Sequence, residues 1–183
     1  MAHNVAMRLL VTGFKPWGDH GANPSELAAS LAARFGFSAE VFPVSYEVVG
    51  QAFEGENFDR ILLFGLASSR SEITLERFAY NETKPELLDV EGKPPRAGLV
   101  LPDGEAQIES KLDLERLCTL LRHEWIPSHI STDPGRYLCN FAYYRALAAT
   151  KGEALFVHLP QLGEGFDENR LKHAVAVLLQ AMH

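Results

Sequence analysis

The sequence predicts an α/β protein in which helices cover both faces of a mostly parallel sheet, a three-layer α/β/α sandwich. Short apolar runs typical of buried strands alternate with segments whose apolar residues recur at helical spacing. The chain has 183 residues, of which 46% are hydrophobic and 22% charged, enough for one sizeable core. We therefore expect a single domain over residues 1–183, with residues 1–7 as a disordered N-terminus.

Charge and cysteine content narrow the classes of function. The formal net charge is -7 and no run of Lys or Arg occurs, so we expect no nucleic acid and no membrane as partner. Two cysteines without CxxC spacing predict neither a disulfide framework nor a zinc cluster. No apolar stretch is long enough to span a bilayer, and the first residues lack the features of a signal peptide. These features favour a cytoplasmic protein.

The first half of the chain alternates strand and helix patterns. Residues 8–12 form an apolar run that predicts a buried strand, and the loop after it lacks the pattern of a phosphate-binding loop. Asn23 supplies a cap for a helix that we expect to extend to about Arg34. The next expected elements are a strand, a short helix or loop, and a buried strand, at residues 39–44, 46–53 and 60–65.

The second half begins with a proline-rich region at residues 81–104, which has little core-helix pattern. We expect an irregular excursion there, placed over the functional site or at a subunit contact. The elements expected after it are a helix, a strand, a helix, a strand and a final helix, at residues 113–124, 128–131, 139–150, 154–160 and 167–182. Cys118 lies on the apolar side of the first of these helices, so we expect it in the core.

Cys139 is the first candidate for chemistry. It follows a turn at Pro134 and Gly135 and stands where a helix is expected to begin. Free backbone N–H groups and the helix dipole favour an anion at that place, so we expect a lowered thiol pKa and a nucleophilic thiolate. The alternative is a cysteine that only packs, since free cysteine is among the most buried residue types.

Two further residues complete a possible catalytic set. His158 interrupts the apolar run that Pro160 closes, and Glu76 stands in a loop after a buried strand, next to Arg77. Each has a structural alternative, a packed histidine in one case and a surface ion pair in the other. Together, however, a cysteine, a histidine and a carboxylate that orients the histidine are the three parts needed for acyl transfer by a thiolate.

Four motifs occur in order along the chain, at residues 11–18, 65–81, 134–144 and 156–160. They read Val-Thr-Gly-Phe-x-Pro-Trp-Gly, then Gly-x-Ala-x-x-Arg-x-x-Ile-Thr-x-Glu-Arg-x-Ala-x-Asn, then Pro-Gly-x-x-Leu-Cys-Asn-x-x-x-Tyr, and last Phe-x-His-x-Pro. Together they resemble the motifs of pyroglutamyl peptidase I, also called pyrrolidone carboxyl peptidase, a family of cysteine exopeptidases that remove N-terminal pyroglutamate.

The resemblance implies a mechanism that needs no metal and no other cofactor. Cys139 attacks the pyroglutamyl carbonyl, His158 takes the thiol proton and later donates one to the leaving amine, and Glu76 holds the imidazole in the useful tautomer. The backbone N–H of Cys139 is the expected oxyanion donor. The resemblance also implies a mixed sheet with one or more antiparallel members, of the phosphorylase/hydrolase-like kind.

The resemblance assigns a substrate pocket to five residues, Phe14, Trp17, Leu66, Tyr137 and Leu138. Phe14 and Trp17 are expected to sandwich the lactam ring of a peptide with N-terminal pyroglutamate. The chain departs from the family at Glu86, where members carry an arginine, and in residues 92–111, which are shorter than in typical members. Assembly into a homo-oligomer stays open.

Two alternatives to a peptidase remain. One is a cysteine amidase on the same scaffold that acts on another small acyl group, and the other is a non-catalytic binding or assembly module. The presence of all three chemical residues at their expected places favours an enzyme.

Overall fold

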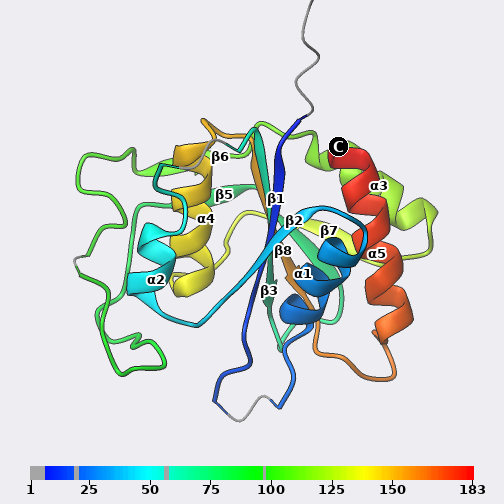
Figure 1. The fold of residues 1–183 in the computed structure, drawn as a ribbon, viewed down its shortest axis with the longest axis horizontal. Helices are drawn as coiled ribbons and strands as arrows, with labels where there is room; N and C mark the ends of the chain where they lie inside the picture. The colour runs from blue at the N-terminus through cyan, green and yellow to red at the C-terminus, as the bar shows by residue number, and fades with distance from the viewer. Residues whose placement is uncertain (1–6, 19–20, 56–57, 97) are drawn as a thin grey trace, which may run out of the picture.

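The computed structural model describes residues 7–18, 21–55, 58–96 and 98–183. It has a six-stranded sheet with helices packed on both of its faces, so the predicted α/β/α architecture is confirmed (Figure 1). Residues 1–6 lie outside the described residues, so the disorder expected at residues 1–7 stays a prediction.

The sheet is mixed, as the family resemblance implies. Its strand order is β2-β1-β3-β8-β4-β7, and every neighbouring pair is parallel except β4 with β8. The six strands are β1 (Leu9–Phe14), β2 (Ser38–Phe42), β3 (Arg60–Leu66), β4 (Ile73–Glu76), β7 (Ser128–Ser131) and β8 (Ala154–Leu159). Strand β4 was not predicted, because its four residues are too few to establish an alternating pattern. Glu76 therefore ends a buried strand and does not stand in a loop.

Helices divide between the two faces of the sheet (Figure 1). One face carries α1 (Pro24–Arg34), α3 (Leu114–His123) and α5 (Glu168–Met182), and the other carries α2 (Tyr46–Gln51) and α4 (Leu138–Ala149). The Asn23 side chain accepts a hydrogen bond from the backbone N–H of Ser25, so the expected cap of α1 is confirmed. Cys118 lies in α3 and is 4% exposed, as expected for a core residue. Among the described helices, none is long and apolar enough to cross a membrane.

Strand β8 shows how the core determines where functional side chains point. All six of its residues are buried, with Leu155, Val157 and Leu159 in the core beneath α1, α3 and α5. Phe156 packs in the other core, beneath α2 and α4. Burial of each of these apolar side chains contributes about 1.5–3 kcal/mol to the free energy of folding. Because alternate side chains of a strand share a face, His158 points to the same side as Phe156, toward α4.

The expected irregular excursion forms. Residues 81–106 contain no helix or strand among those described, and two short antiparallel strands close its ends. These strands are β5 (Phe78–Tyr80) and β6 (Gln107–Glu109). The Tyr46 hydroxyl donates to the Leu87 carbonyl at 3.1 Å, and the Tyr137 hydroxyl donates to the Leu88 carbonyl at 2.9 Å. The excursion is thus tied to α2 and to the residue before α4.

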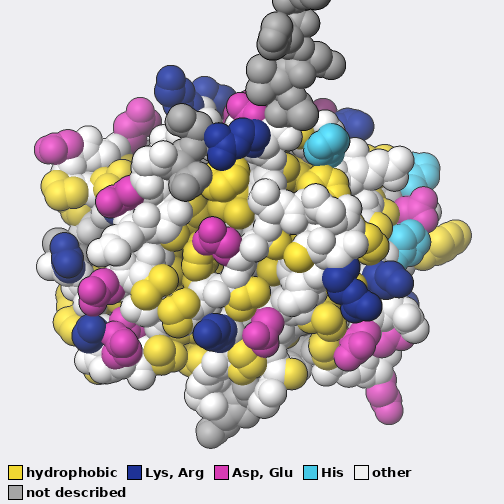
Figure 2. Space-filling model, viewed as in Figure 1, with side chains coloured by type: hydrophobic (Ala, Val, Ile, Leu, Met, Phe, Trp, Pro, Cys, Tyr) yellow, Lys and Arg dark blue, Asp and Glu magenta, His cyan; other side chains and the backbone are white. Residues whose placement is uncertain are grey.

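The surface carries charges of both signs. Figure 2 shows acidic and basic side chains interspersed with apolar ones over one face of the molecule, where neither charge forms a continuous field. This distribution agrees with the modest net charge of -7.

Candidate active site

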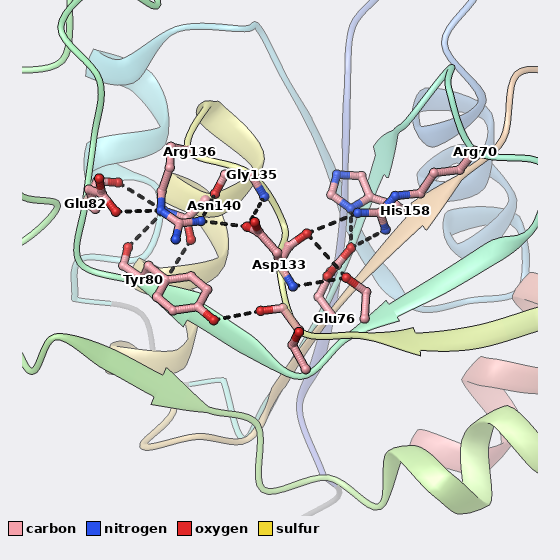
Figure 3. A network of polar contacts seen from close by, with 11 residues as sticks. Arg70, Glu76, Tyr80, Glu82, Asp133, Gly135, Arg136, Asn140 and His158 are labelled. Carbon is pink, nitrogen blue, oxygen red and sulfur yellow. Dashed lines mark hydrogen bonds and ion pairs between the residues drawn. The ribbon is translucent and has the colours of Figure 1, made fainter.

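Glu76 and His158 form a buried pair on the α4 side of the sheet. The Nδ1 atom of His158 lies 2.7 Å from Oε1 of Glu76, whose side chain is 0% exposed (Figure 3). The antiparallel pairing of β4 with β8 places Glu76 opposite Phe156, two residues from His158, so the two side chains are diagonal neighbours on one face. The structure therefore brings together the carboxylate and the imidazole that the sequence singled out.

Burial and charge determine the resting state of this pair. Burial lowers the pKa of His158, and the opposing effect of Glu76 does not restore it. Burial alone would raise the pKa of Glu76, but the hydrogen bond and charge of His158, with smaller contributions from the Ser131 hydroxyl and Arg70, bring it below its ordinary value. The resting pair is an ionised carboxylate and a neutral imidazole. Since a carboxylate only accepts hydrogen bonds, Nδ1 carries the proton and Nε2 is left as a base.

Cys139 lies over the strand that adjoins His158. It is the second residue of α4, and its side chain is partly exposed. Gly65 pairs with His158 in the register of β3 with β8, and a Cβ atom at Gly65 would lie 3.1 Å from the sulfur of Cys139 and 2.5 Å from Phe156. Only glycine leaves room there for both the sulfur and the buried ring. Among the described contacts no hydrogen bond joins Cys139 to His158, as is common before substrate binds.

The resting thiol corrects one expectation. The helix start was expected to lower the pKa of Cys139, but burial and then the negative charge of Glu76 raise the pKa to about 12. The charge of Arg70 and the backbone N–H of Cys139 itself lower it by less. Desolvation of a thiolate thus outweighs the helix terminus. The resting group is a thiol, which needs a base to become a nucleophile.

The residue at the amino end of α4 does not cap the helix with its side chain. Tyr137 occupies the cap position without a side-chain hydrogen bond to the helix, so its side chain leaves the N–H groups of the first turn uncapped. Two other residues of α4 hold the helix in place. The Tyr143 hydroxyl donates to the Glu76 carbonyl at 2.7 Å, and the Asn140 side chain exchanges hydrogen bonds of 2.8 Å with both backbone groups of Tyr80.

The arginine that pairs with Glu76 is Arg70. An ion pair with Arg77 was the structural alternative for Glu76, and it is wrong, because Glu76 pairs with Arg70 and His158 instead. Arg77 instead pairs with Glu109 at 3.4 Å and with Glu115. Arg70, which comes from the loop before β4, places a guanidinium nitrogen 2.5 Å from Oε1 of Glu76. No pattern within a single segment of the sequence predicted the contact between Arg70 and Glu76.

Tyr137 links four of the five pocket residues, since it packs against the core that holds Phe14 and Leu138 and lies beside Trp17. The rings of Trp17 and Tyr137 lie 5.8 Å apart, and Trp17 is 37% exposed. Phe14 is 3% exposed and Leu138 is 2% exposed, and both belong to the core beneath α4. Leu66 ends β3 and is partly buried. The expected sandwich of Phe14 and Trp17 around a lactam ring stays a prediction. Among the described residues, no group of three or more His, Cys, Asp or Glu could hold a metal.

Comparisons with known proteins agree with the motifs. The family model described as pyroglutamyl peptidase matches residues 7–176. A pyrrolidone-carboxylate peptidase from Levilactobacillus brevis is 34% identical over 171 residues, which cover 86% of this chain and 84% of the relative. The chain belongs to the pyroglutamyl peptidase family. Pyroglutamyl-peptidase 1 from Rattus norvegicus, 29% identical, covers 95% of the chain and 88% of its own length.

Solved structures of the pyroglutamyl peptidase family have the same fold. A pyrrolidone carboxyl peptidase from Thermococcus litoralis superimposes with a TM-score of 0.87 at 24% identity, over 96% of this chain and 93% of that one. A mutant pyrrolidone carboxyl peptidase from Pyrococcus furiosus gives a TM-score of 0.84 at 28% identity, over 96% and 98%. These likenesses confirm the mixed α/β sheet that the resemblance implied.

The departure expected at Glu86 falls on the excursion. Glu86 is exposed there, and its correspondence to a family arginine stays a prediction. Asp89, three residues on, is buried and accepts backbone hydrogen bonds from Tyr46, Glu91 and Lys93 at 2.9–3.2 Å. Asp89 is thus one of the anchors of the excursion, while Glu86 lies in solvent.

Proposed function

We propose that this protein is a cysteine exopeptidase that hydrolyses the amide bond after an N-terminal pyroglutamyl residue. The observation that carries the proposal is the buried pair of Glu76 and His158, 2.7 Å apart, on the face over which the sulfur of Cys139 lies. Membership of the family supplies the substrate class.

The charges of the site fit general-base activation of a thiol. Since the pKa of Cys139 is about 12, little thiolate exists near neutral pH, and the neutral His158 takes the proton as the sulfur attacks the carbonyl. The imidazolium then protonates the leaving amine, and a thioester remains on the sulfur. A water molecule, deprotonated by the same imidazole, attacks the thioester and releases pyroglutamate and the free thiol. Glu76 stabilises the imidazolium in both steps.

The open amino end of α4 suits the oxyanion that forms in each step. Its uncapped N–H groups and the positive end of its dipole lie beside Cys139, where negative charge develops on the carbonyl oxygen. We assign the backbone N–H of Cys139 as a donor to this oxyanion.

One observation favours the amidase as a second candidate. Phe14 lies in the core at 3% exposure, so the aromatic sandwich around a lactam is not preformed. The neighbouring rings of Trp17 and Tyr137, without a facing Phe14, would also accept other small acyl groups on the same machinery.

Hydrolysis of pyroglutamyl p-nitroanilide tests the proposal, with alanyl, prolyl and acetyl p-nitroanilides as a panel. We expect release of nitroaniline from the pyroglutamyl amide alone, and none with Cys139→Ala. Cleavage of another acyl amide in place of the pyroglutamyl one would select the amidase, and cleavage of none would select a non-catalytic module. Size measurement in solution decides whether the chain forms a homo-oligomer. The need for a free thiol agrees with the cytoplasmic location expected from the sequence.

A further inference from the structure

Arg70 joins two parts of the site that are far apart in the sequence. One guanidinium nitrogen lies 2.5 Å from Oε1 of Glu76, at the end of β4. Another donates to the backbone carbonyl of Asp133 at 3.1 Å, in the loop between β7 and α4 (Figure 3). That loop leads directly to Cys139. A single side chain thus spans the carboxylate of the buried pair and the segment that carries the nucleophile.

The loop before α4 depends on side chains for its position, because it lies outside the sheet. The Tyr80 hydroxyl donates to the Thr132 carbonyl at 2.7 Å, and Arg136 pairs with both Asp133 and Glu82 at 2.7 Å. Figure 3 shows these contacts as one continuous network that reaches Glu76 through Arg70. The outer contacts lie at the surface and are individually weak. Arg70 connects these surface contacts to the fully buried Glu76 carboxylate.

The buried carboxylate also needs a counter-charge. Glu76 is 0% exposed, and His158 is neutral in the resting state, so the positive charge in contact with Glu76 is that of Arg70. An unpaired carboxylate in such a place is strongly unfavourable. The two Arg70 contacts use separate nitrogens of one planar group, an arrangement that lysine cannot reproduce.

We propose that Arg70 is a positioning residue that fixes the Glu76 carboxylate against His158 and holds the Cys139 loop in register with that pair. Its effect on turnover rests on the proposed peptidase function. The positive charge of Arg70 also acts on His158 and Cys139. Burial moves the pKa of His158 down and that of Cys139 up, and the charge of Arg70 lowers both.

Three variants test the proposal through turnover of a pyroglutamyl amide. Arg70→Met removes the charge and both hydrogen bonds, and Arg70→Lys keeps the charge without the planar fork. Arg77→Met is the matched control, because Arg77 also pairs with two glutamates, Glu109 and Glu115, but not with Glu76. We expect Arg70→Met to lower kcat about ten- to a hundredfold with a smaller change in KM, the size of one lost charge-assisted contact. Arg70→Lys should fall between it and the wild type, and Arg77→Met should match the wild type.

A second measurement does not depend on the substrate. Titration of His158 by NMR on protein with ¹⁵N-labelled histidine, assigned by the signal lost in His158→Gln, reports the state of the pair directly. We expect a raised His158 pKa in Arg70→Met, and with it an acid limb of kcat/KM displaced to higher pH, because the nearby positive charge is gone.

The outcomes separate this proposal from the proposed function. Wild-type kcat together with an unchanged His158 titration in folded Arg70→Met would overturn the positioning role. If that variant does not fold, Arg70→Lys decides, and wild-type kcat there would overturn it equally. An inactive wild type would instead refute the peptidase assignment, while the histidine titration still tests the contact of Arg70 with the buried pair.

Discussion

Replacing Glu76 by glutamine removes one buried negative charge while nearly preserving the shape of the side chain. Oε1 of Glu76 contacts both His158 Nδ1 at 2.7 Å and Arg70 at 2.5 Å. A carboxamide still offers one acceptor oxygen, but without its charge. If the amide nitrogen faces Nδ1, the imidazole adopts the other tautomer, and Nε2 then carries the proton that it should accept from Cys139.

The size of the effect follows from the charge that Glu76 supplies to the imidazolium. Two unit charges about 4 Å apart interact by about 4 kcal/mol at an effective dielectric constant of about 20. Since about 1.36 kcal/mol corresponds to a tenfold change in rate, we expect Glu76→Gln to lower kcat about a thousandfold. KM should change little, because the carboxylate acts through His158 and does not reach the substrate.

The same substitution has a signature in stability. The pKa of Glu76 is lowered in the folded state, so its ionised form stabilises the fold above its ordinary pKa of 4.5, and this contribution is lost as pH falls below that value. The variant lacks this contribution. The difference in unfolding free energy between wild type and Glu76→Gln should therefore stay constant from pH 7 to about 5 and shrink as the pH is lowered below 4.5, measured by urea unfolding.

Steady-state kinetics with pyroglutamyl p-nitroanilide provides the assay, and Glu115→Gln is the matched control. Glu115 is an exposed carboxylate paired with Arg77, away from the site, and its variant should retain wild-type kcat. A kcat for Glu76→Gln within tenfold of the wild type would refute the reasoning, and Glu76 would then be a structural partner of Arg70.

Three other predictions concern the nucleophile, the base and the pocket. Cys139→Ala and Cys139→Ser should fold normally yet lose nearly all hydrolysis, and iodoacetamide should label Cys139 well before Cys118, which is 4% exposed; equal labelling by mass spectrometry would contradict this. The pKa of His158 is lowered by burial, so the unfolded chain binds more protons below its ordinary pKa of 6.5, and stability should fall as pH drops through 6.5. Urea unfolding at pH 7 and pH 5 should show a weaker pH dependence of stability in His158→Gln than in the wild type. An equal pH dependence in both proteins would exclude this contribution of His158. Trp17→Ala should raise KM about ten- to a hundredfold through loss of apolar contact with the ring, whereas Phe14→Ala should mainly lower stability, by about 3–5 kcal/mol, because Phe14 lies in the core. Kinetics and urea unfolding of the two variants check this division, and an unchanged KM in Trp17→Ala would remove Trp17 from the pocket.

Local patterns in the sequence were enough to predict most of the fold. Strand β7 has the predicted bounds, Ser128–Ser131, and α4 begins one residue before the predicted start at Cys139. These elements follow from side-chain periodicity and from turn residues, which act over a few positions of the chain. The order of the motifs was likewise sufficient to indicate the family.

The sequence by itself also named Glu76, Cys139 and His158, because few residue types carry acyl-transfer chemistry and their motifs are local. Only the tertiary structure decided how they meet. Strand β4, the contact of Arg70 with Glu76 and the close approach of Gly65 to Cys139 all depend on segments that the sheet brings together. The charge states depended on it as well. A helix start favours a thiolate, yet the desolvation that raises the pKa of Cys139 to about 12 comes from burial against the sheet and the core beneath α4, which no pattern within one segment can reveal.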